Sequence, residues 1–457
     1  MPDETASDAA KEQTPVLECP LSFVLREKDG KPGIPREAKA RLGADGLALL
    51  PRGRESIFLS YRDILGIDKT DYSVTLSLLS GETISLSELG YRFEDFIRLL
   101  HRFRNETLLA DLLMKEPILR PDVGAEYRRL DASGKEIGGG RGKIRVYQTS
   151  LVLIPEKGEF ERFYLSDIDA VEAADYVLTI TAEREDKIVL SQMGSEIDSL
   201  ERVLNGQIGE LFIKAQSLLK GFSPGLSPDL VRRAARLVKE GRGAKRADLE
   251  AVSPSIWRGL ESGLASQGLK EEFDFLKPMA RNENIRLGWK RGLSGGPEAD
   301  YVWFLIPLYG QGSGRPGNAA VWEATTGEEE EGRATYFFRL LDRDEFSKTS
   351  AIADLDRAVD ESLNRMILGL RAVNFRREPI YLPDERLEEP RFVHDRFAAA
   401  GIPSLQTLRR RFIGRVIHSS KEQWEKDVMD LLAFNASAPD EAVRWVRSEA
   451  KPEGTGD

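Results

Sequence analysis

Three cations recur at one spacing in two separate parts of the chain. The second set follows the first by 104 residues, and each reads Lys, seven residues, then Lys-x-Arg. Two cations one residue apart on a strand point to the same side, and a third from a neighbouring strand could close on a phosphate group. The pattern therefore predicts an anion-binding site in each copy. The predicted site residues are Lys31, Lys39, Arg41, Lys135, Lys143 and Arg145.

The same cations can also be interpreted as solvated charges at the edge of a sheet, where lysine discourages aggregation. Acidic residues flank both sets, and most of the chain's net charge of −10 lies within residues 1–221. These acidic surroundings favour the second interpretation. The glycines at 138–140 favour the first, because they would leave backbone N–H groups free for an anion. The sequence leaves both interpretations open.

Two loops contain residues typical of ligand sites. Residues 310–318 are rich in glycine, but the segment lies between two predicted strands and lacks the Gly-Lys-Ser/Thr ending of a phosphate loop. We therefore predict a hairpin loop there. Residues 328–331 are four adjacent glutamates. Because adjacent carboxylates on a turn do not converge, we predict a solvated turn and no metal site.

Residues 408–415 form a basic, amphipathic stretch that could touch an anionic membrane or a nucleic acid. The next predicted helix carries several acidic residues, so pairing across a helical hairpin is the favoured interpretation. All six tryptophans lie between Trp257 and Trp445. They could line a ligand pocket, although tryptophans more often anchor a core or an interface.

The sequence offers little for catalysis. His394-Asp395 and His418-Ser419 supply acid–base residue types, but no motif assigns a nucleophile or an oxyanion donor. The single cysteine, Cys19, excludes an internal disulfide framework and a thiolate zinc site. It is placed before the first strand, with no nearby cation to lower its pKa. We expect no cofactor and no metal, and an enzyme is the less favoured class.

Composition limits the class of protein further. The chain has 457 residues, of which 41% are hydrophobic and 31% charged, so it can bury two to four domain cores. No apolar run reaches the roughly 18 residues of a membrane-spanning helix. The first fifteen residues lack the features of a signal peptide, which favours a cytoplasmic protein. The negative net charge argues against general nucleic-acid binding.

An internal repeat with a constant offset of 104 residues organises the first half of the chain. Asp71-Tyr72 recurs as Asp175-Tyr176, and Asp63-Ile64 recurs as Asp167-Ile168. Each copy predicts several short strands, followed by a helix with one apolar stripe. The strands of the first copy are predicted at residues 22–27, 47–50, 57–61, 64–68, 73–79 and 83–87. The apolar stripes are Phe93, Phe96, Ile97, Leu100 and Phe103 in the first copy, and Ile197, Leu200, Val203, Leu204 and Ile208 in the second.

A run of short strands closed by an amphipathic helix resembles the pleckstrin-homology-like (PH-like) fold. Residues 61–68 and 83–87 look like the middle strands of bacterial members, and the resemblance covers residues 17–220. It implies a tandem PH-like protein, from a group that binds lipids or peptides or acts as a scaffold. Lipid-binding members often hold an inositol phosphate through a similarly spaced basic set, which implies the same role for the six cations above.

The C-terminal half predicts a separate α+β domain. Strands are expected at 301–308, 319–324 and 333–341, and helices from 228, at 255–266, 351–371, 405–417 and 421–434. The strands and the 351–371 helix would permit a divergent third copy, although the 104-residue register is absent. The predicted divisions are a flexible tail at 1–16, PH-like repeats at 17–118 and 119–221, the α+β domain at 222–448, and a flexible tail at 449–457.

Three functions follow as hypotheses. The first is a non-enzymatic cytoplasmic scaffold that binds a protein partner through the tandem PH-like domains and could self-associate. The second is a peripheral membrane adaptor that recognises anionic headgroups, chiefly through Lys39, Arg41, Lys143 and Arg145. The third is an enzyme with an unrecognised site in the C-terminal domain.

Overall fold

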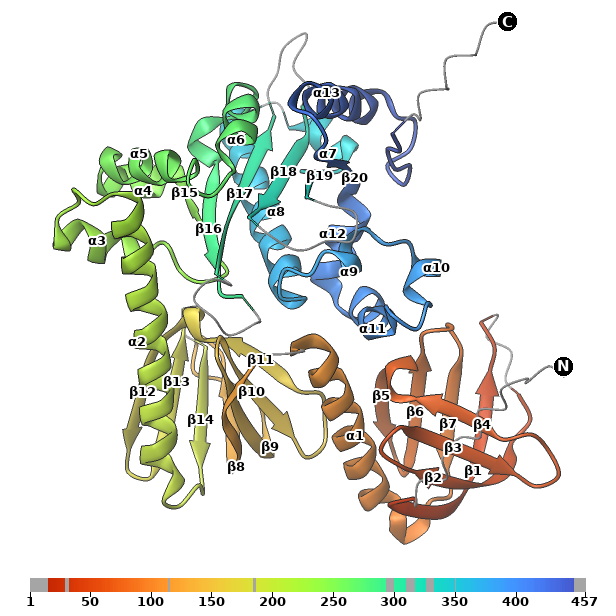
Figure 1. Ribbon diagram of the computed structural model, residues 1–457. Coiled ribbons are helices and arrows are strands. Elements are labelled where there is room, and N and C mark those ends of the chain that lie inside the picture. Colours follow the sequence, from red (N-terminus) through yellow and green to blue (C-terminus); the bar gives the residue numbers. More distant parts are fainter. Residues whose placement is uncertain are drawn as a thin grey trace, which may run out of the picture. The chain divides into compact units, whose positions relative to one another are not determined.

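The computed structural model describes residues 15–28, 33–113, 116–183, 186–292, 300–309, 317–325, 333–349 and 351–447. Its contacts divide the chain into two compact units (Figure 1). The first unit comprises residues 1–111 and 154–161, and the second comprises residues 112–153 and 162–457. The domain boundaries drawn from the sequence remain predictions.

The first unit contains a seven-stranded antiparallel sheet in the order β4-β3-β2-β1-β7-β6-β5, followed by helix α1. The strands are β1 (Leu17–Arg26), β2 (Arg36–Leu42), β3 (Gly46–Pro51), β4 (Ile57–Ser60), β5 (Ile64–Thr70), β6 (Ser73–Leu78) and β7 (Thr83–Ser87). Alternate residues of β6 and β7 are buried, so one face of the sheet covers the core. The strands predicted from alternating hydrophobicity are present, and β2 is an additional one. Cys19 lies within β1, and not before it as predicted.

Helix α1 (Phe93–Leu113) covers this core as its apolar stripe predicts. Phe93, Phe96, Ile97 and Leu100 are 0–3% exposed and pack with the sheet residues, with Phe103 half-buried beside them. Glu94 and Asp95 in the first turn suit the positive end of the helix dipole. The change of period from two to 3.6 therefore marks the strand-to-helix boundary correctly.

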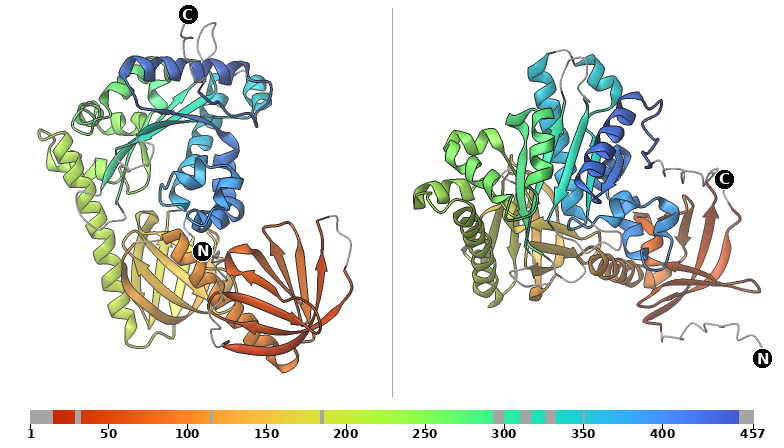
Figure 2. Two further views of the ribbon diagram at one scale, coloured as in Figure 1. Left: turned by 45° about the vertical axis from the view of Figure 1, so that its right-hand side comes forward. Right: turned by 45° about the horizontal axis from the view of Figure 1, so that its top comes forward.

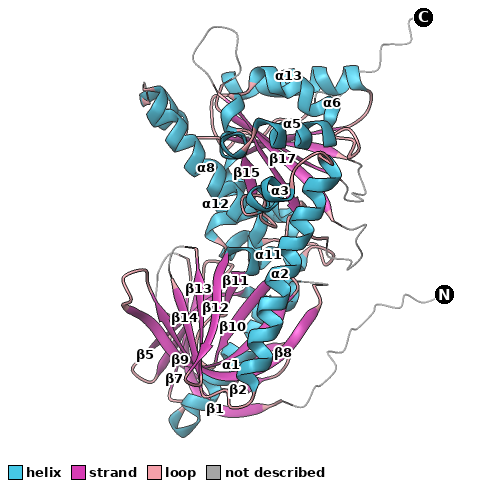
Figure 3. Ribbon diagram, turned by 90° about the vertical axis from the view of Figure 1, so that its left-hand side faces the viewer, coloured by secondary structure: helices cyan, strands magenta, loops and turns pink. Residues whose placement is uncertain are grey.

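The second sheet repeats the first strand by strand, in the order β11-β10-β9-β8-β14-β13-β12. Its elements are β8 (Ile118–Leu130), β9 (Glu136–Tyr147), β10 (Ser150–Pro155), β11 (Glu161–Tyr164), β12 (Ile168–Ala174), β13 (Val177–Ala182), β14 (Lys187–Ser191) and helix α2 (Glu196–Phe222). Figure 3 shows α2 as a long helix running beside these strands. Its buried residues include Ile197, Leu200 and Leu204 of the predicted stripe.

The backbone reproduces the duplication in detail. Left-handed residues recur at the 104-residue offset in three places: Tyr72 and Tyr176, Glu88 and Gln192, Gly90 and Gly194. The same strand order, the same closing helix and the same unusual backbone angles confirm a duplicated sheet-and-helix unit. Each copy has the PH-like architecture, a small antiparallel sheet closed by a C-terminal helix, and the fold class predicted from the sequence is confirmed.

The C-terminal part of the second unit is an α+β arrangement around a six-stranded antiparallel sheet in the order β15-β16-β17-β18-β19-β20. This sequential order differs from that of the two repeats, so the sheet is not a third copy. Its strands are β15 (Gly243–Lys245), β16 (Arg286–Lys290), β17 (Tyr301–Leu308), β18 (Ala319–Ala324), β19 (Ala334–Arg339) and β20 (Phe412–Ile417).

Helices cover both faces of this sheet (Figure 2), and the residues of β16, β18 and β19 are therefore all buried. The principal helices are α3 (Pro228–Ala235), α4 (Arg246–Val252), α5 (Pro254–Gly263), α6 (Lys270–Leu276), α8 (Ile352–Ala372), α12 (Pro403–Arg411) and α13 (Lys421–Ser437). Short helices lie at α7 (Arg343–Lys348), α9 (Glu378–Tyr381), α10 (Asp384–Leu387) and α11 (Val393–Gly401).

Tryptophans fill the core on both sides of the C-terminal sheet. Trp257, Trp289, Trp303, Trp322 and Trp424 are at most 4% exposed, which supports the core-anchor interpretation. Trp257 lies against Phe273, and Trp303 and Trp322 lie against Phe375. Among the described helices of the chain, none combines the length and the apolar character needed to cross a membrane.

The helix predicted at 405–417 is wrong in its second half. Helix α12 ends at Arg411, and Phe412–Ile417 forms strand β20, which pairs with β19. Glycine at position 414 avoids a close contact in this strand. A Cβ there would lie only 3.2 Å from the carbonyl oxygen of Trp445. The apolar residues of this segment fit a helical period as well as a strand, so periodicity alone could not separate the two.

Candidate functional site

The structure places the predicted basic pairs on equivalent strands. Lys39 and Arg41 lie on β2, and Lys143 and Arg145 lie on β9, each pair on the outward side of its strand. Each pair shares one carboxylate from the neighbouring strand. Glu18 accepts from Lys39 and, at 2.7 Å, from Arg41 Nε. Asp122 accepts from Lys143 Nζ at 2.9 Å and from Arg145 Nε at 2.7 Å.

The bound cations lower the pKa values of these two carboxylates. The hydrogen bond from Lys39 is the main cause that lowers the pKa of Glu18. At Asp122 burial raises the pKa, but the hydrogen bonds from Arg145 and Lys143 outweigh it and leave the pKa lowered. Glu18 and Asp122 are themselves 104 residues apart. The duplicated unit thus carries a duplicated cross-strand triad, in which one carboxylate neutralises one of the two positive charges.

The third cation of the second set lies elsewhere. Lys135 is exposed in the β8–β9 hairpin, where its backbone N–H donates to Asp131 Oδ1 at 3.0 Å. Lys143 lies eight residues further along the extended chain, so roughly 26 Å separates the two by strand rise. The second set therefore does not converge on one phosphate group. Lys31 lies outside the described residues, as do residues 310–316 of the glycine-rich loop and all of 328–331.

A carboxylate–histidine cluster, which the sequence did not predict, lies between α6, β18 and the end of β20. His418 Nδ1 is 3.4 Å from Glu272 Oε1, and its Nε2 is 3.1 Å from Glu323 Oε1. Glu323 is fully buried and accepts from Thr335 Oγ1 at 2.7 Å. One ligand atom from each of these two carboxylates and the imidazole lies within 4.8 Å of the others, a set that divalent metals use.

Arg333 already balances this carboxylate–histidine cluster. Its Nε donates to Glu323 at 2.7 Å, and its Nη2 lies 3.1 Å from Glu272. Burial and the charge of Glu323 raise the pKa of Glu272 despite this cation. A hollow of about 170 Å³ opens beside His418 and Glu272. A metal ion would compete with Arg333 for both carboxylates, and we therefore interpret the cluster as a partly buried ion-pair network between α6 and the sheet.

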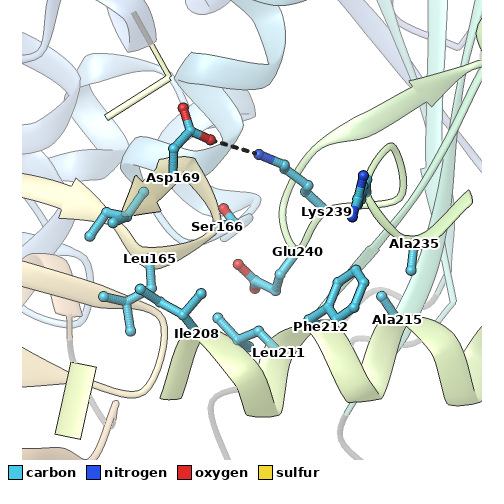
Figure 4. Close-up of a pocket in the computed structure, with 12 residues that line it drawn as sticks. Leu165, Ser166, Asp169, Ile208, Leu211, Phe212, Ala215, Ala235, Lys239 and Glu240 are labelled. Atoms are coloured by element: carbon cyan, nitrogen blue, oxygen red, sulfur yellow. Dashed lines mark ion pairs between the residues drawn. The ribbon is translucent and has the colours of Figure 1, made fainter. Parts of the chain in front are cut away.

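A pocket of about 390 Å³ lies between the second repeat, α2 and α3 (Figure 4). Ile208, Leu211 and Phe212 of α2 form its apolar floor. At its rim Lys239 reaches Glu183 at 2.7 Å and Asp169 at 3.9 Å. Glu240 is buried and pairs with Lys290 at 2.7 Å. Lys239 and Glu240 are thus engaged in ion pairs, and the exposed Arg236 also lines the pocket.

Asp167 joins the second repeat to the C-terminal sheet domain within the second unit. It accepts two hydrogen bonds from Arg371, at 2.9 and 3.0 Å, and one from Arg242 Nε at 2.9 Å. The guanidinium of Arg371 also stacks 3.7 Å above the Tyr164 ring. Burial raises the pKa of Asp167, but the charge of Arg371 and the hydrogen bonds outweigh it, so the pKa is lowered.

The arginines at 408–415 take partners other than those predicted. Arg409 pairs with Asp384, Arg411 donates to the Leu340 carbonyl and to Ser362, and Arg415 lies over the Tyr381 ring. The expected helical hairpin does not form because residue 412 begins a strand.

Comparisons with known proteins identify no family for the chain. No protein-family model matches it, and no curated protein matches it. Among solved structures, it is similar to the "Structure of the Spt16D Pob3N heterodimer", with 14% sequence identity over 37% of this chain and 84% of that chain. The TM-score of that match is 0.16. A value this low supports no inference, so the fold assignment rests on the strand order and closing helices described above.

Proposed function

We propose that the chain is a cytoplasmic binding protein, without enzymatic activity, that contacts a protein partner through its tandem PH-like repeats, which we assign to the bacterial type. The observation that carries this proposal is a tyrosine at the tip of one hairpin in each repeat. Tyr72 joins β5 to β6 and Tyr176 joins β12 to β13. Their side chains are 78% and 88% exposed.

Both tyrosines occupy a backbone conformation that is unfavourable for a residue with a Cβ, although the Tyr72 ring also lies 5.6 Å from that of Phe93. Their φ angles are 62° and 61°, in the left-handed region where a residue with a Cβ loses about 1–2 kcal/mol relative to its usual conformations. Hairpin tips of this kind normally carry glycine or asparagine. Tyr91, an equally exposed tyrosine of the first copy, corresponds to Ser195 in the second. Retention of tyrosine at both strained tips therefore supports selection for contact with another molecule.

Tyrosine suits such a contact. It offers a large apolar surface at low cost in side-chain entropy and a hydroxyl for one hydrogen bond, and it is enriched at protein interfaces. The membrane-adaptor hypothesis receives less support, because Glu18 and Asp122 already bind the cations that would face a headgroup. An anionic lipid would have to compete with carboxylates held on the same sheet.

The test compares two variants of the full chain as affinity baits in cells of the source organism. Y72G/Y176G replaces both tips with the residue the backbone prefers, and Y91S converts the unretained tyrosine to its counterpart. We expect Y72G/Y176G to stay folded, because relief of the left-handed strain offsets the lost contact between Tyr72 and Phe93, yet to lose about 30-fold or more of its affinity for the stoichiometric partner, as hot-spot tyrosines do. Y91S should retain the partner. Equal capture by wild type and Y72G/Y176G would refute the proposal.

A further inference from the structure

An arginine-lined pocket of about 590 Å³ lies at one end of the six-stranded sheet. It collects residues from the end of β19, from α8, from α12 and from the segment that follows α13. The lining arginines are Arg339, Arg365, Arg410, Arg411 and Arg444. The lining carboxylates are Asp342, Asp440 and Glu441. Five cations thus face three anions, in a protein whose net charge is −10.

Arg339 is the residue at this pocket whose hydrogen bonds are incomplete. It is 2% exposed, and its Nη1 donates to the Glu441 carbonyl. Its Nε and Nη2 have no hydrogen-bond partner among the described residues. Burial, and then the charge of Arg343, lower its pKa. Buried guanidinium N–H groups without acceptors are costly, because they have lost water without gaining a protein partner.

The other arginines separate into structural and available groups. Arg411 is 8% exposed and donates to the Leu340 carbonyl and to Ser362, so it holds α12 against the sheet and α8. Arg444 donates to the backbone carbonyls of Arg409 and Arg410 at the end of α12. Arg365 and Arg410 are exposed at the pocket. Arg410 makes one long hydrogen bond, 3.4 Å, to Thr407.

We propose that this pocket binds a phosphorylated small molecule, with its phosphate held by Arg365 and Arg410 and with the charge of the buried Arg339 adding to the attraction. Guanidinium groups bind phosphate oxygens through paired, charge-assisted hydrogen bonds, and a dianion balances the excess of two positive charges. The volume exceeds what a phosphate fills, and the carboxylates of Asp342 and Asp440 can accept hydrogen bonds from hydroxyl groups of the ligand body. The site is independent of the tyrosine tips.

The experiment uses inorganic pyrophosphate as the probe and titration calorimetry of the full chain at low and high salt. R365Q/R410Q removes two exposed cations and leaves Arg411 and Arg444, which hold the backbone around the pocket, unchanged. R202Q/R258Q is the control, because it removes two exposed helix arginines outside the pocket and changes the net charge equally. We expect R365Q/R410Q to weaken pyrophosphate binding by about tenfold or more and the control to bind within about twofold of the wild type.

A melting experiment provides a second readout. Pyrophosphate should raise the melting temperature of the wild type and of R202Q/R258Q, and should not raise that of R365Q/R410Q. A wild type that does not bind pyrophosphate, or an equal loss in both variants, would overturn the proposal. Vesicles of phosphatidylcholine with phosphatidic acid separate a soluble source of phosphate from a membrane. Sedimentation with these vesicles without pyrophosphate binding would assign the phosphate to a lipid and also overturn it.

Discussion

His101 on α1 is held neutral by its surroundings. Its side chain is 6% exposed, and burial, together with the charge of Arg104, lowers its pKa to about 4. The unfolded chain takes up the proton near pH 6.5, so between pH 6.5 and 4 the unfolded state binds more protons than the folded state. Folding stability must therefore fall as the pH falls through this window.

The loss of folding stability that His101 causes is about 3 kcal/mol at most, because its pKa differs by roughly 2.5 units between the unfolded and the folded chain. His101→Leu fills a similar volume without a titrating group, and we expect it to lack this part of the acid sensitivity. Hydrogen exchange of the α1 amides at pH 7 and near pH 4, corrected for intrinsic rates, measures the effect locally. An identical pH dependence in variant and wild type would show that His101 is not its source.

Residue types and the repeat offset predict the cations of the cross-strand triads but not their carboxylates. The 104-residue offset correctly relates Lys39 and Arg41 to Lys143 and Arg145, because the two pairs lie on equivalent strands of the two repeats. Their shared carboxylates, Glu18 and Asp122, obey the same offset, but nothing in the local sequence identifies them as the partners of these cations. A cross-strand partner lies far away in sequence, and pairing register decides which acid meets which base.

Close packing between helices explains a pair of glycines on α5. A Cβ on Gly259 would lie 2.6 Å from Ser223 Cβ, and one on Gly263 would lie 2.3 Å from Phe222 Cδ1 at the end of α2. Gly206 in the middle of α2 has open space around it. The two positions therefore respond in opposite ways to the same added methyl group.

We expect Gly263→Ala to lower stability by about 1–3 kcal/mol, because overpacking outweighs the better helix propensity of alanine. Gly206→Ala should raise stability by about 0.5–1 kcal/mol through propensity alone. Thermal denaturation of the two variants against the wild type measures both. If Gly263→Ala were as stable as Gly206→Ala, the close contact between α2 and α5 would be absent in solution.

The arginine pocket shows what local sequence patterns could not predict. Its lining comes from β19, α8, α12 and the segment after α13, so only the tertiary fold unites it. The Glu272–Glu323–His418 cluster is assembled in the same way, from positions about 50 and 95 residues apart. By contrast, each sheet-and-helix repeat was predictable, because its pattern of alternation and helical period is local.

At the scale of the second unit, one continuous core extends from the second repeat through α2 and α3 into the C-terminal sheet. The Asp167–Arg371–Arg242 ion pairs lie along this junction. Arg371 is 2% exposed, so removal of one partner leaves a buried charge without compensation.

We expect Arg371→Met to destabilise the second unit by about 3–5 kcal/mol, and the double variant D167N/R371M to lose less than the sum of the single changes. Because the folded-state pKa of Asp167 is depressed, the pair stabilises above the ordinary carboxyl pKa. That stabilisation is lost as the pH falls through the lowered value. Urea unfolding followed by tryptophan fluorescence measures the stability of this unit, since all six tryptophans lie between Trp257 and Trp445. Strictly additive single changes would rule out the pairing.

The shared core has an evolutionary consequence for the duplication. Helix α2 is 27 residues long, against 21 for α1, and its buried Leu211, Ala215 and Leu219 belong to the core that continues into the C-terminal sheet. A substitution on α2 must therefore satisfy both its own sheet and the following domain. The second copy therefore packs against the C-terminal half as well as closing its own sheet, and fewer substitutions are tolerated on α2 than on a helix that packs against one sheet.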